Sequence, residues 1–179
     1  MSAPGSTPTP GGGARPSGAG GTATRPVSAE TDRKIDALLP KYPRKASALL
    51  PALYAVQEEH GWVPEEAQEY VAGKLGVSPA FVAGVVSFYT MFHRKPVGKH
   101  HIQVCRTLSC MLRGSHEVMA RLEQKLGIER GQVTPDGRFS LQFVECLGAC
   151  DTAPCAQIND DDVPLLDAAK VDELLARLR

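Results

Sequence analysis

The sequence has no long apolar run and no excess of charge of either sign. No stretch approaches the roughly 20 apolar residues that a helix needs to cross a bilayer. Twenty basic and 20 acidic residues give a formal net charge of zero, whereas proteins that bind nucleic acids or acidic membranes usually carry a basic excess. We therefore expect no nucleic-acid partner and no direct membrane insertion, with at most a peripheral position at a membrane.

Large apolar side chains are almost absent from residues 1–30. Seven glycines and five prolines stand among these 30 residues, and Met1 and Val27 are the large apolar ones. Such a segment cannot bury enough surface to offset its ordering entropy, so we predict a disordered Gly/Pro-rich tail. It also lacks the apolar core of about 7–15 residues that a secretory signal contains. We expect a reducing compartment, where cysteines serve metal or redox chemistry.

Helical spacing dominates residues 31–95. Ser28 is followed by early acidic residues, and Ser78 is followed by a proline, two patterns that favour a helix start. Gly61 and Gly76 each follow an apolar pattern at the place where a helix C-terminus favours glycine. The sequence therefore predicts a small helical bundle of three or four short helices around a shared core.

The pattern changes after Lys99, and residues 96–179 mix strands with helices. Two alternating segments, 100–105 and 138–146, predict strands that each end at a cysteine. An amphipathic segment with Ser115 as its expected cap predicts a helix between them. Two short strands and a closing helix are predicted downstream, at "CAQIND", "DDVPLLD" and "AAKVDELLARLR". This order is typical of an α/β layer arrangement, so the whole chain is of the α+β class, a helical bundle followed by a small α/β domain.

Four of the five cysteines follow the two predicted strands in pairs. Cys105 and Cys110 enclose four residues, and Cys146 and Cys150 enclose three. If the two strands are neighbours in one sheet, their end loops meet at one edge and the four thiols converge there.

This spacing leaves three kinds of site open: an iron–sulfur cluster, a structural zinc site, and a thiol or disulfide site. Structural zinc prefers about two to four residues between paired cysteines, so the longer loop is at the edge of that range. A thioredoxin-type dithiol would read C-x-x-C, and neither pair does. The wider loops favour a 2Fe–2S cluster, in which each of two metals takes one pair of thiolates.

Residues around the two pairs are also suited to a cluster. Gly148 can let the backbone approach closely, and Arg106 and Arg113 can offset the negative charge of an iron–sulfur centre. The fifth thiol, Cys155, is expected to be a small core residue. We therefore expect its replacement by alanine to leave a cluster intact.

The segment "DGRFSLQFVECLGACDTAP" (136–154) resembles the signature of a known family. That pattern reads D-x-x-F-S, five residues, then C-L-G-x-C-x-x-A-P, and every fixed position is present here. The family comprises the thioredoxin-like 2Fe–2S subunits of NADH:quinone oxidoreductase, respiratory complex I. "CRTLSCMLRGS" (105–115) resembles its first ligand loop, and the resemblance extends over about residues 35–179.

The resemblance implies a helical bundle domain (31–95) followed by a thioredoxin-like 2Fe–2S ferredoxin domain (96–179). One 2Fe–2S cluster is then held by Cys105, Cys110, Cys146 and Cys150. It further implies a flavoprotein partner subunit that carries FMN and binds NADH, together with other subunits of the peripheral arm of complex I. This chain would transfer electrons with no catalytic residue and no activity alone, on the cytoplasmic side and peripheral to the inner (plasma) membrane. The absence of a Gly-rich dinucleotide fingerprint agrees with NADH binding elsewhere.

Two alternative functions also agree with the sequence. Related modules serve as diaphorase subunits of NAD-dependent formate dehydrogenases and bidirectional hydrogenases. A zinc-stabilised interaction module belongs to a different class, and it predicts a colourless protein with one zinc per chain.

Overall fold

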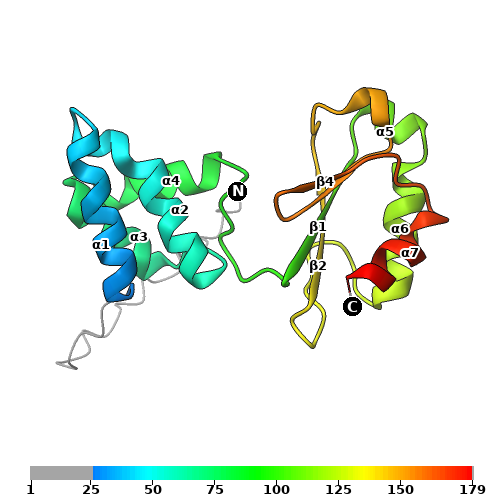
Figure 1. The fold of residues 1–179 in the computed structure, drawn as a ribbon, viewed down its shortest axis with the longest axis horizontal. Coiled ribbons are helices and arrows are strands. Elements are labelled where there is room, and N and C mark those ends of the chain that lie inside the picture. The colour runs from blue at the N-terminus through cyan, green and yellow to red at the C-terminus, as the bar shows by residue number, and fades with distance from the viewer. Residues whose placement is uncertain (1–25, 179) are drawn as a thin grey trace, which may run out of the picture.

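The computed structural model describes residues 26–178, which form two lobes joined by one segment of chain (Figure 1). Most of the predicted tail, residues 1–25, lies outside the described residues. Val27 is already buried in the core of the helical lobe, and the first helix starts at Ala29, directly after Ser28.

Four α-helices build the first lobe: α1 (Ala29–Leu38), α2 (Leu49–His60), α3 (Glu65–Leu75) and α4 (Pro79–Phe88). Two 3-10 turns, Leu39–Lys41 and Lys45–Ala48, connect α1 to α2. The core contains fully buried side chains from every helix, among them Ile35, Leu53, Val56, Val71 and Val82. None of the helices within residues 26–178 is long and apolar enough to span a bilayer.

The helix boundaries of this lobe confirm the capping residues predicted from the sequence. Ser28 Oγ accepts the Thr31 amide at 3.1 Å, and Ser78 Oγ accepts the Phe81 amide at 3.2 Å. A glycine in the left-handed conformation ends both α2 and α3. Local signals were sufficient here because each cap involves residues close in sequence.

The second lobe is a four-stranded mixed sheet with helices. Its strands are β1 (His100–Cys105), β2 (Phe139–Val144), β3 (Ala156–Ile158) and β4 (Asp161–Val163), in the order β2-β1-β3-β4. Strands β1 and β2 run parallel, and the two other pairings are antiparallel. Its helices are α5 (Leu108–Leu112), α6 (Ser115–Leu126) and α7 (Lys170–Arg177), with a 3-10 turn at Cys150–Thr152.

The two faces of this sheet differ in polarity. Apolar strand residues, among them Ile102, Val104, Leu141 and Ile158, pack in one core with side chains of α6 and α7. Because side chains alternate along a strand, the intervening residues of β1 and β2 form the other face, and these are polar: His101, Gln103, Ser140 and Gln142. In Figure 1 the helices α6 and α7 lie on the side of the sheet away from the helical lobe.

The segment before β1 ties the polar face to the helical lobe. The His93 amide donates to Gln57 Oε1 of α2 at 2.7 Å, and the His93 ring lies edge-on to His101 with ring centroids 4.9 Å apart. Further along, the Gly98 amide donates to Ser140 Oγ at 2.9 Å. The same few residues therefore contact both lobes.

The start of α6 differs from the sequence prediction. Ser115 is the first helical residue and not the cap, because Gly114 adopts the left-handed conformation at φ 96° and occupies the cap position. The Ser115 hydroxyl is buried and has no hydrogen-bond partner within residues 26–178. The five-residue helix α5 was not predicted either, since its one turn is too short to show a hydrophobic period.

Candidate metal centre

The parallel pairing of β1 and β2 brings the two cysteine loops to one edge of the sheet. Cys105 at the end of β1 is in register with Val144 at the end of β2, and the pairing continues as Arg106 N–H donates to Val144 O at 3.0 Å. Both strands therefore end at the same level. The conditional prediction that the strands are sheet neighbours is confirmed.

The first pair of thiols lies inside the lobe. Cys105 is the last residue of β1 and Cys110 lies in α5, and each is only 2% exposed. The turn of helix between them folds Cys110 back towards the strand end, and the two Sγ atoms lie within 4.8 Å of each other.

The second pair lies at the surface. Cys146 and Cys150 are both exposed, their Sγ atoms are 4.0 Å apart, and the Gly148 amide points at Cys146 Sγ from 3.3 Å. Gly148 has φ 82°, and a Cβ at this position would meet no atom within 4 Å. Glycine at position 148 is therefore favoured by its left-handed backbone conformation, and not by the close approach of the backbone to other atoms expected from the sequence.

Contacts between the loops join the two pairs into one region. Leu147 and Ala149 of the second loop pack against the buried cysteines of the first. Burial raises the pKa of Cys105, but hydrogen bonds donated by the Thr107 and Leu147 amides outweigh it and hold the pKa below its ordinary value. The Leu147 amide of the second loop thus donates a hydrogen bond to the Cys105 sulfur of the first loop.

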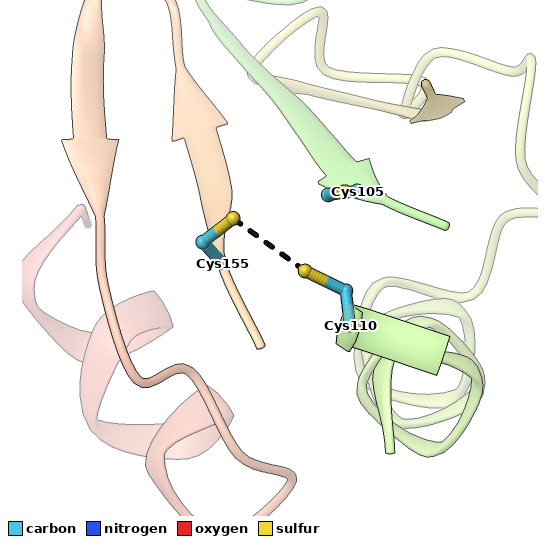
Figure 2. A group of neighbouring side chains, drawn as sticks. All are labelled: Cys105, Cys110 and Cys155. Carbon is cyan, nitrogen blue, oxygen red and sulfur yellow. Dashed lines mark hydrogen bonds between the residues drawn. The ribbon is translucent and has the colours of Figure 1, made fainter. Parts of the chain in front are cut away.

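Cys155 lies closer to the first pair than the sequence suggested. It is buried, as expected for a core residue, but its Sγ is 3.6 Å from Cys110 Sγ, and Figure 2 shows the two sulfurs turned towards each other. Cys105, Cys110 and Cys155 have all their Sγ atoms within 4.8 Å of one another. Burial, followed by the neighbouring Cys110 thiol, raises the pKa of Cys155 to about 12.

The pairing of β3 with β1 accounts for this position. Ala156 opposite Val104 places the residue before β3 beside the end of β1, and Cys105 N–H donates to Cys155 O at 3.1 Å. The sequence signal was a cysteine at the entry of a predicted strand. It could not be used without knowing that this strand is antiparallel to β1.

The two arginines expected near the thiols make other contacts. Arg106 forms an ion pair with Glu145 at the surface, with Nε–Oε1 at 3.0 Å, so its charge is compensated. Arg113 Nε donates to Ala153 O at 2.7 Å and ties the residue after α5 to the loop that precedes Cys155.

The thiol geometry fits a metal–thiolate centre. A tetrahedral metal with metal–sulfur bonds of about 2.3 Å holds two thiolates about 3.8 Å apart. The 4.0 Å separation of Cys146 and Cys150 is close to that value, and the Sγ atoms of Cys105 and Cys110 lie within 4.8 Å of each other. Two such pairs in contacting loops match the donor set of a 2Fe–2S cluster, in which each iron takes two thiolates.

The fold and the paired cysteines define a class, the thioredoxin-like 2Fe–2S ferredoxins, and the family of that description matches residues 35–179. The chain is 47% identical over 146 residues to an NADH-quinone oxidoreductase subunit of Rhizobium meliloti, covering 82% of this chain and 87% of that one. It is 48% identical over 142 residues to NADH-quinone oxidoreductase subunit 2 of Thermus thermophilus, covering 78% of each. The chain belongs to the thioredoxin-like 2Fe–2S subunit family of the NADH-quinone oxidoreductases.

A more distant similarity is found among solved structures. An NAD+-reducing NiFe-hydrogenase chain superimposes with a TM-score of 0.65 at 27% identity, and the match covers 73% of this chain. It covers only 22% of the hydrogenase chain.

Proposed function

We propose that this protein is an electron-transfer subunit of an NADH-quinone oxidoreductase. In this proposal one 2Fe–2S cluster is held by Cys105, Cys110, Cys146 and Cys150, and it exchanges electrons with the FMN of a partner flavoprotein subunit that binds NADH. When bound, such a cluster supplies reversible one-electron transfer. The complex would place the chain on the cytoplasmic side, peripheral to the inner (plasma) membrane, with residues 31–95 and 96–179 as its two domains.

The observation that carries the proposal is the meeting of two cysteine pairs at one sheet edge. The Sγ atoms of Cys146 and Cys150 are 4.0 Å apart, close to the separation of about 3.8 Å on one tetrahedral metal, and those of Cys105 and Cys110 lie within 4.8 Å of each other. The relatives that cover most of the chain are named as subunits of NADH-quinone oxidoreductases, which supports the respiratory assignment.

Backbone amides of this chain would stabilise the thiolates. The Cys105 sulfur accepts hydrogen bonds from the Thr107 and Leu147 amides. The Cys110 sulfur accepts one from the Cys155 amide, and the Cys146 sulfur accepts one from the Gly148 amide. Amide donors to sulfur favour the thiolate over the thiol and are one of the factors that set the potential of an iron–sulfur centre. A substitution that keeps the main chain keeps these bonds.

The surface beside the first pair suits a protein partner. Leu108 and Leu112 of α5 are 63% and 73% exposed, and Met111 between them is 44% exposed. Exposed apolar side chains gathered on one short element are typical of interaction surfaces. The side chains that border the centre could therefore pack against the flavoprotein, while the interior of the lobe shields Cys105 and Cys110 from water.

The test compares Cys146→Ala with Cys155→Ala in the full chain. We expect Cys146→Ala to lose the visible absorption, the acid-labile sulfide and the EPR signal that appears after dithionite reduction. Cys155→Ala should keep all three, because it retains the amide that serves Cys110. An unchanged spectrum in Cys146→Ala contradicts the ligand set.

The same purified protein separates this proposal from its alternatives. A colourless, EPR-silent protein with one zinc per chain, made under anaerobic and iron-replete conditions, would indicate a zinc-stabilised interaction module. The isolated iron-containing chain should show no NADH:ferricyanide activity, since the proposal assigns NADH binding to the partner.

A second candidate function is favoured by the similarity to the NAD+-reducing hydrogenase chain. In that case the protein would be the diaphorase subunit of a hydrogenase or an NAD-dependent formate dehydrogenase, with the same cluster chemistry. Purification from its native host through a tag on this chain distinguishes the two. Quinone-reductase subunits in the eluate support the first function, and nickel- or molybdenum-containing subunits support the second.

A further inference from the structure

Three buried thiols of this chain already lie at distances suited to one metal ion. Cys110 Sγ and Cys155 Sγ are 3.6 Å apart, and Cys105 Sγ lies within 4.8 Å of both. Thiolates on one tetrahedral zinc ion lie about 3.8 Å apart. We call Cys105, Cys110 and Cys155 the inner triad. One of its members, Cys155, is not a ligand of the proposed cluster.

The surroundings of the inner triad suit a small thiophilic cation. All three residues are buried, at 2%, 2% and 4% exposure, and Ala153, Leu147 and Ala149 pack around them. An apolar shell of this kind strengthens charge interactions inside it.

The inner triad is anchored by three different elements. Cys105 ends β1, Cys110 lies in α5, and Cys155 directly precedes β3. The β1–β3 pairing and the Cys105 N–H to Cys155 O bond at 3.1 Å fix two of them against each other, and Arg113 holds the end of α5 to Ala153. Ligands on rigid elements require little reorganisation when they bind a metal.

We propose that the cluster-free chain binds one Zn²⁺ through the inner triad, with water in the fourth position. Binding converts three thiols to thiolates and releases three protons to the buffer. Because Cys105 and Cys110 belong to both donor sets, zinc and the proposed 2Fe–2S cluster exclude each other. Cys155 belongs to the zinc site alone, and Cys146 and Cys150 belong to the cluster alone.

This division of ligands gives a direct test on the cluster-free full chain under reducing, anaerobic conditions. The wild-type chain should bind one zinc, measured by competition with a chromophoric chelator and by elemental analysis. Cys155→Ser should weaken zinc binding by at least about 10- to 100-fold, since the loss of even an outer-shell partner costs that much affinity. Cys146→Ser and Cys150→Ser are the matched controls and should bind zinc with wild-type affinity.

Cobalt provides a second measurement that reports the ligands themselves. Co²⁺ in the wild-type chain should show thiolate-to-metal charge-transfer absorption of three thiolates, and Cys155→Ser that of two. Cys155→Ala, with circular dichroism matching the wild type, guards against a folding defect specific to the serine variant.

Wild-type zinc affinity in both Cys155 variants would overturn the proposal. An equal loss of zinc affinity in the Cys146 and Cys155 variants would also overturn it. A failure here is distinguishable from a failure of the proposed function. Iron uptake by Cys155→Ser tests the cluster, whereas zinc binding by Cys146→Ser tests the inner triad, and neither result depends on the other.

Discussion

At the scale of single residues, Gly98 lies in the segment that joins the two lobes, and its backbone packs closely against the backbone of β2. A Cβ on Gly98 would lie 2.4 Å from the carbonyl carbon of Phe139 and 2.7 Å from its Cα. The obstructing atoms belong to the backbone of β2, so they cannot turn aside as a side chain does. Gly73 inside α3 is the opposite case, since a Cβ there would meet nothing within 4 Å.

We therefore predict opposite effects of the same substitution at these two glycines. Gly98→Ala should lower the free energy of unfolding by about 2–3 kcal/mol through overpacking. Gly73→Ala should raise it by about 0.5–1 kcal/mol, because alanine is the better helix former. Urea unfolding followed by circular dichroism measures both, and equal midpoints for the two variants would contradict the assigned contacts.

The cysteines show which part of a site can be predicted from sequence. The pairing of Cys105 with Cys110 and of Cys146 with Cys150 follows from short spacings and from strands that end at cysteines. The approach of Cys155 to Cys110 depends on the antiparallel pairing of β3 with β1, which no local pattern encodes. The hydrogen bonds from the Thr107 and Leu147 amides to the Cys105 sulfur depend on loop conformation, so they could not be predicted from the sequence either.

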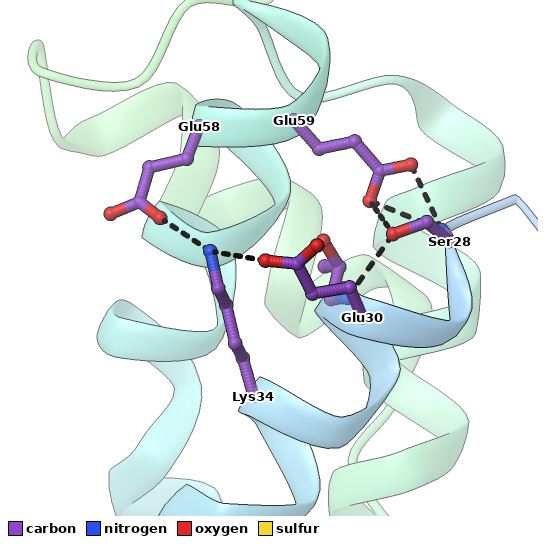
Figure 3. A network of polar contacts seen from close by, with 6 residues as sticks. Ser28, Glu30, Lys34, Glu58 and Glu59 are labelled. Atoms are coloured by element: carbon purple, nitrogen blue, oxygen red, sulfur yellow. Dashed lines mark hydrogen bonds and ion pairs between the residues drawn. The ribbon is translucent and has the colours of Figure 1, made fainter.

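At the scale of elements, one cap joins two helices of the first lobe. Ser28 caps α1, and its hydroxyl and backbone amide also donate to the carboxylate of Glu59 near the end of α2, at 3.0 and 2.9 Å (Figure 3). Lys34 lies close by, but its ion pairs to Glu30 and Glu58 are long, at 3.6 and 3.4 Å, and largely exposed.

This contrast gives a prediction at the level of the α1–α2 pair. Ser28→Ala removes the cap of α1 and one bond to α2, and we expect it to cost about 1–2 kcal/mol of stability. Lys34→Gln removes only exposed ion pairs, so the cost should stay below about 0.5 kcal/mol. Thermal and urea unfolding of the two variants test this order. A larger cost for Lys34→Gln would show that the surface network, and not the cap, holds the helices.

Element types were predictable where the signal is local. The four helices of the first lobe have capping residues and apolar stripes within a few positions, and the strands 100–105 and 139–144 show clear alternation. Helix α5 and the start of α6 were not predicted. One is too short for a period, and Gly114 takes the cap position that Ser115 was expected to fill.

At the scale of the whole molecule, a buried histidine couples pH to the contact between the lobes. His101 lies on the polar face of the sheet, with Nδ1 2.7 Å from Ser140 Oγ and Nε2 3.2 Å from Gln142 Oε1. Burial, followed by the nearby His93, lowers the pKa of His101 to about 4. Burial also lowers the pKa of His93, against the opposing effect of Asp160.

The sign of the pH dependence follows from these shifts. Between about pH 6.5 and pH 4 the unfolded chain binds a proton that folded His101 does not, so stability falls as the pH falls through this range. For His101 alone we expect a loss of about 1 kcal/mol between pH 7.5 and pH 5.5. Urea unfolding of the cluster-free chain at the two pH values measures it.

A variant of His101 itself tests this assignment. His101→Gln should reduce the loss of stability between the two pH values. An unaltered pH dependence in His101→Gln would place the titrating group elsewhere.

The family signature, residues 136–154, begins before strand β2 and ends beyond it, and its two ends have different structural roles. At the start, Asp136 accepts the Arg138 amide at 3.0 Å, and Ser140 meets Gly98 and His101 at the joint. Near the other end are Cys146 and Cys150. A loss-of-function lesion at Ser140 would therefore be a defect of assembly, although it falls within an iron–sulfur motif. In a genetic screen, the position of a lesion within this signature would separate defects in assembly from defects in electron transfer.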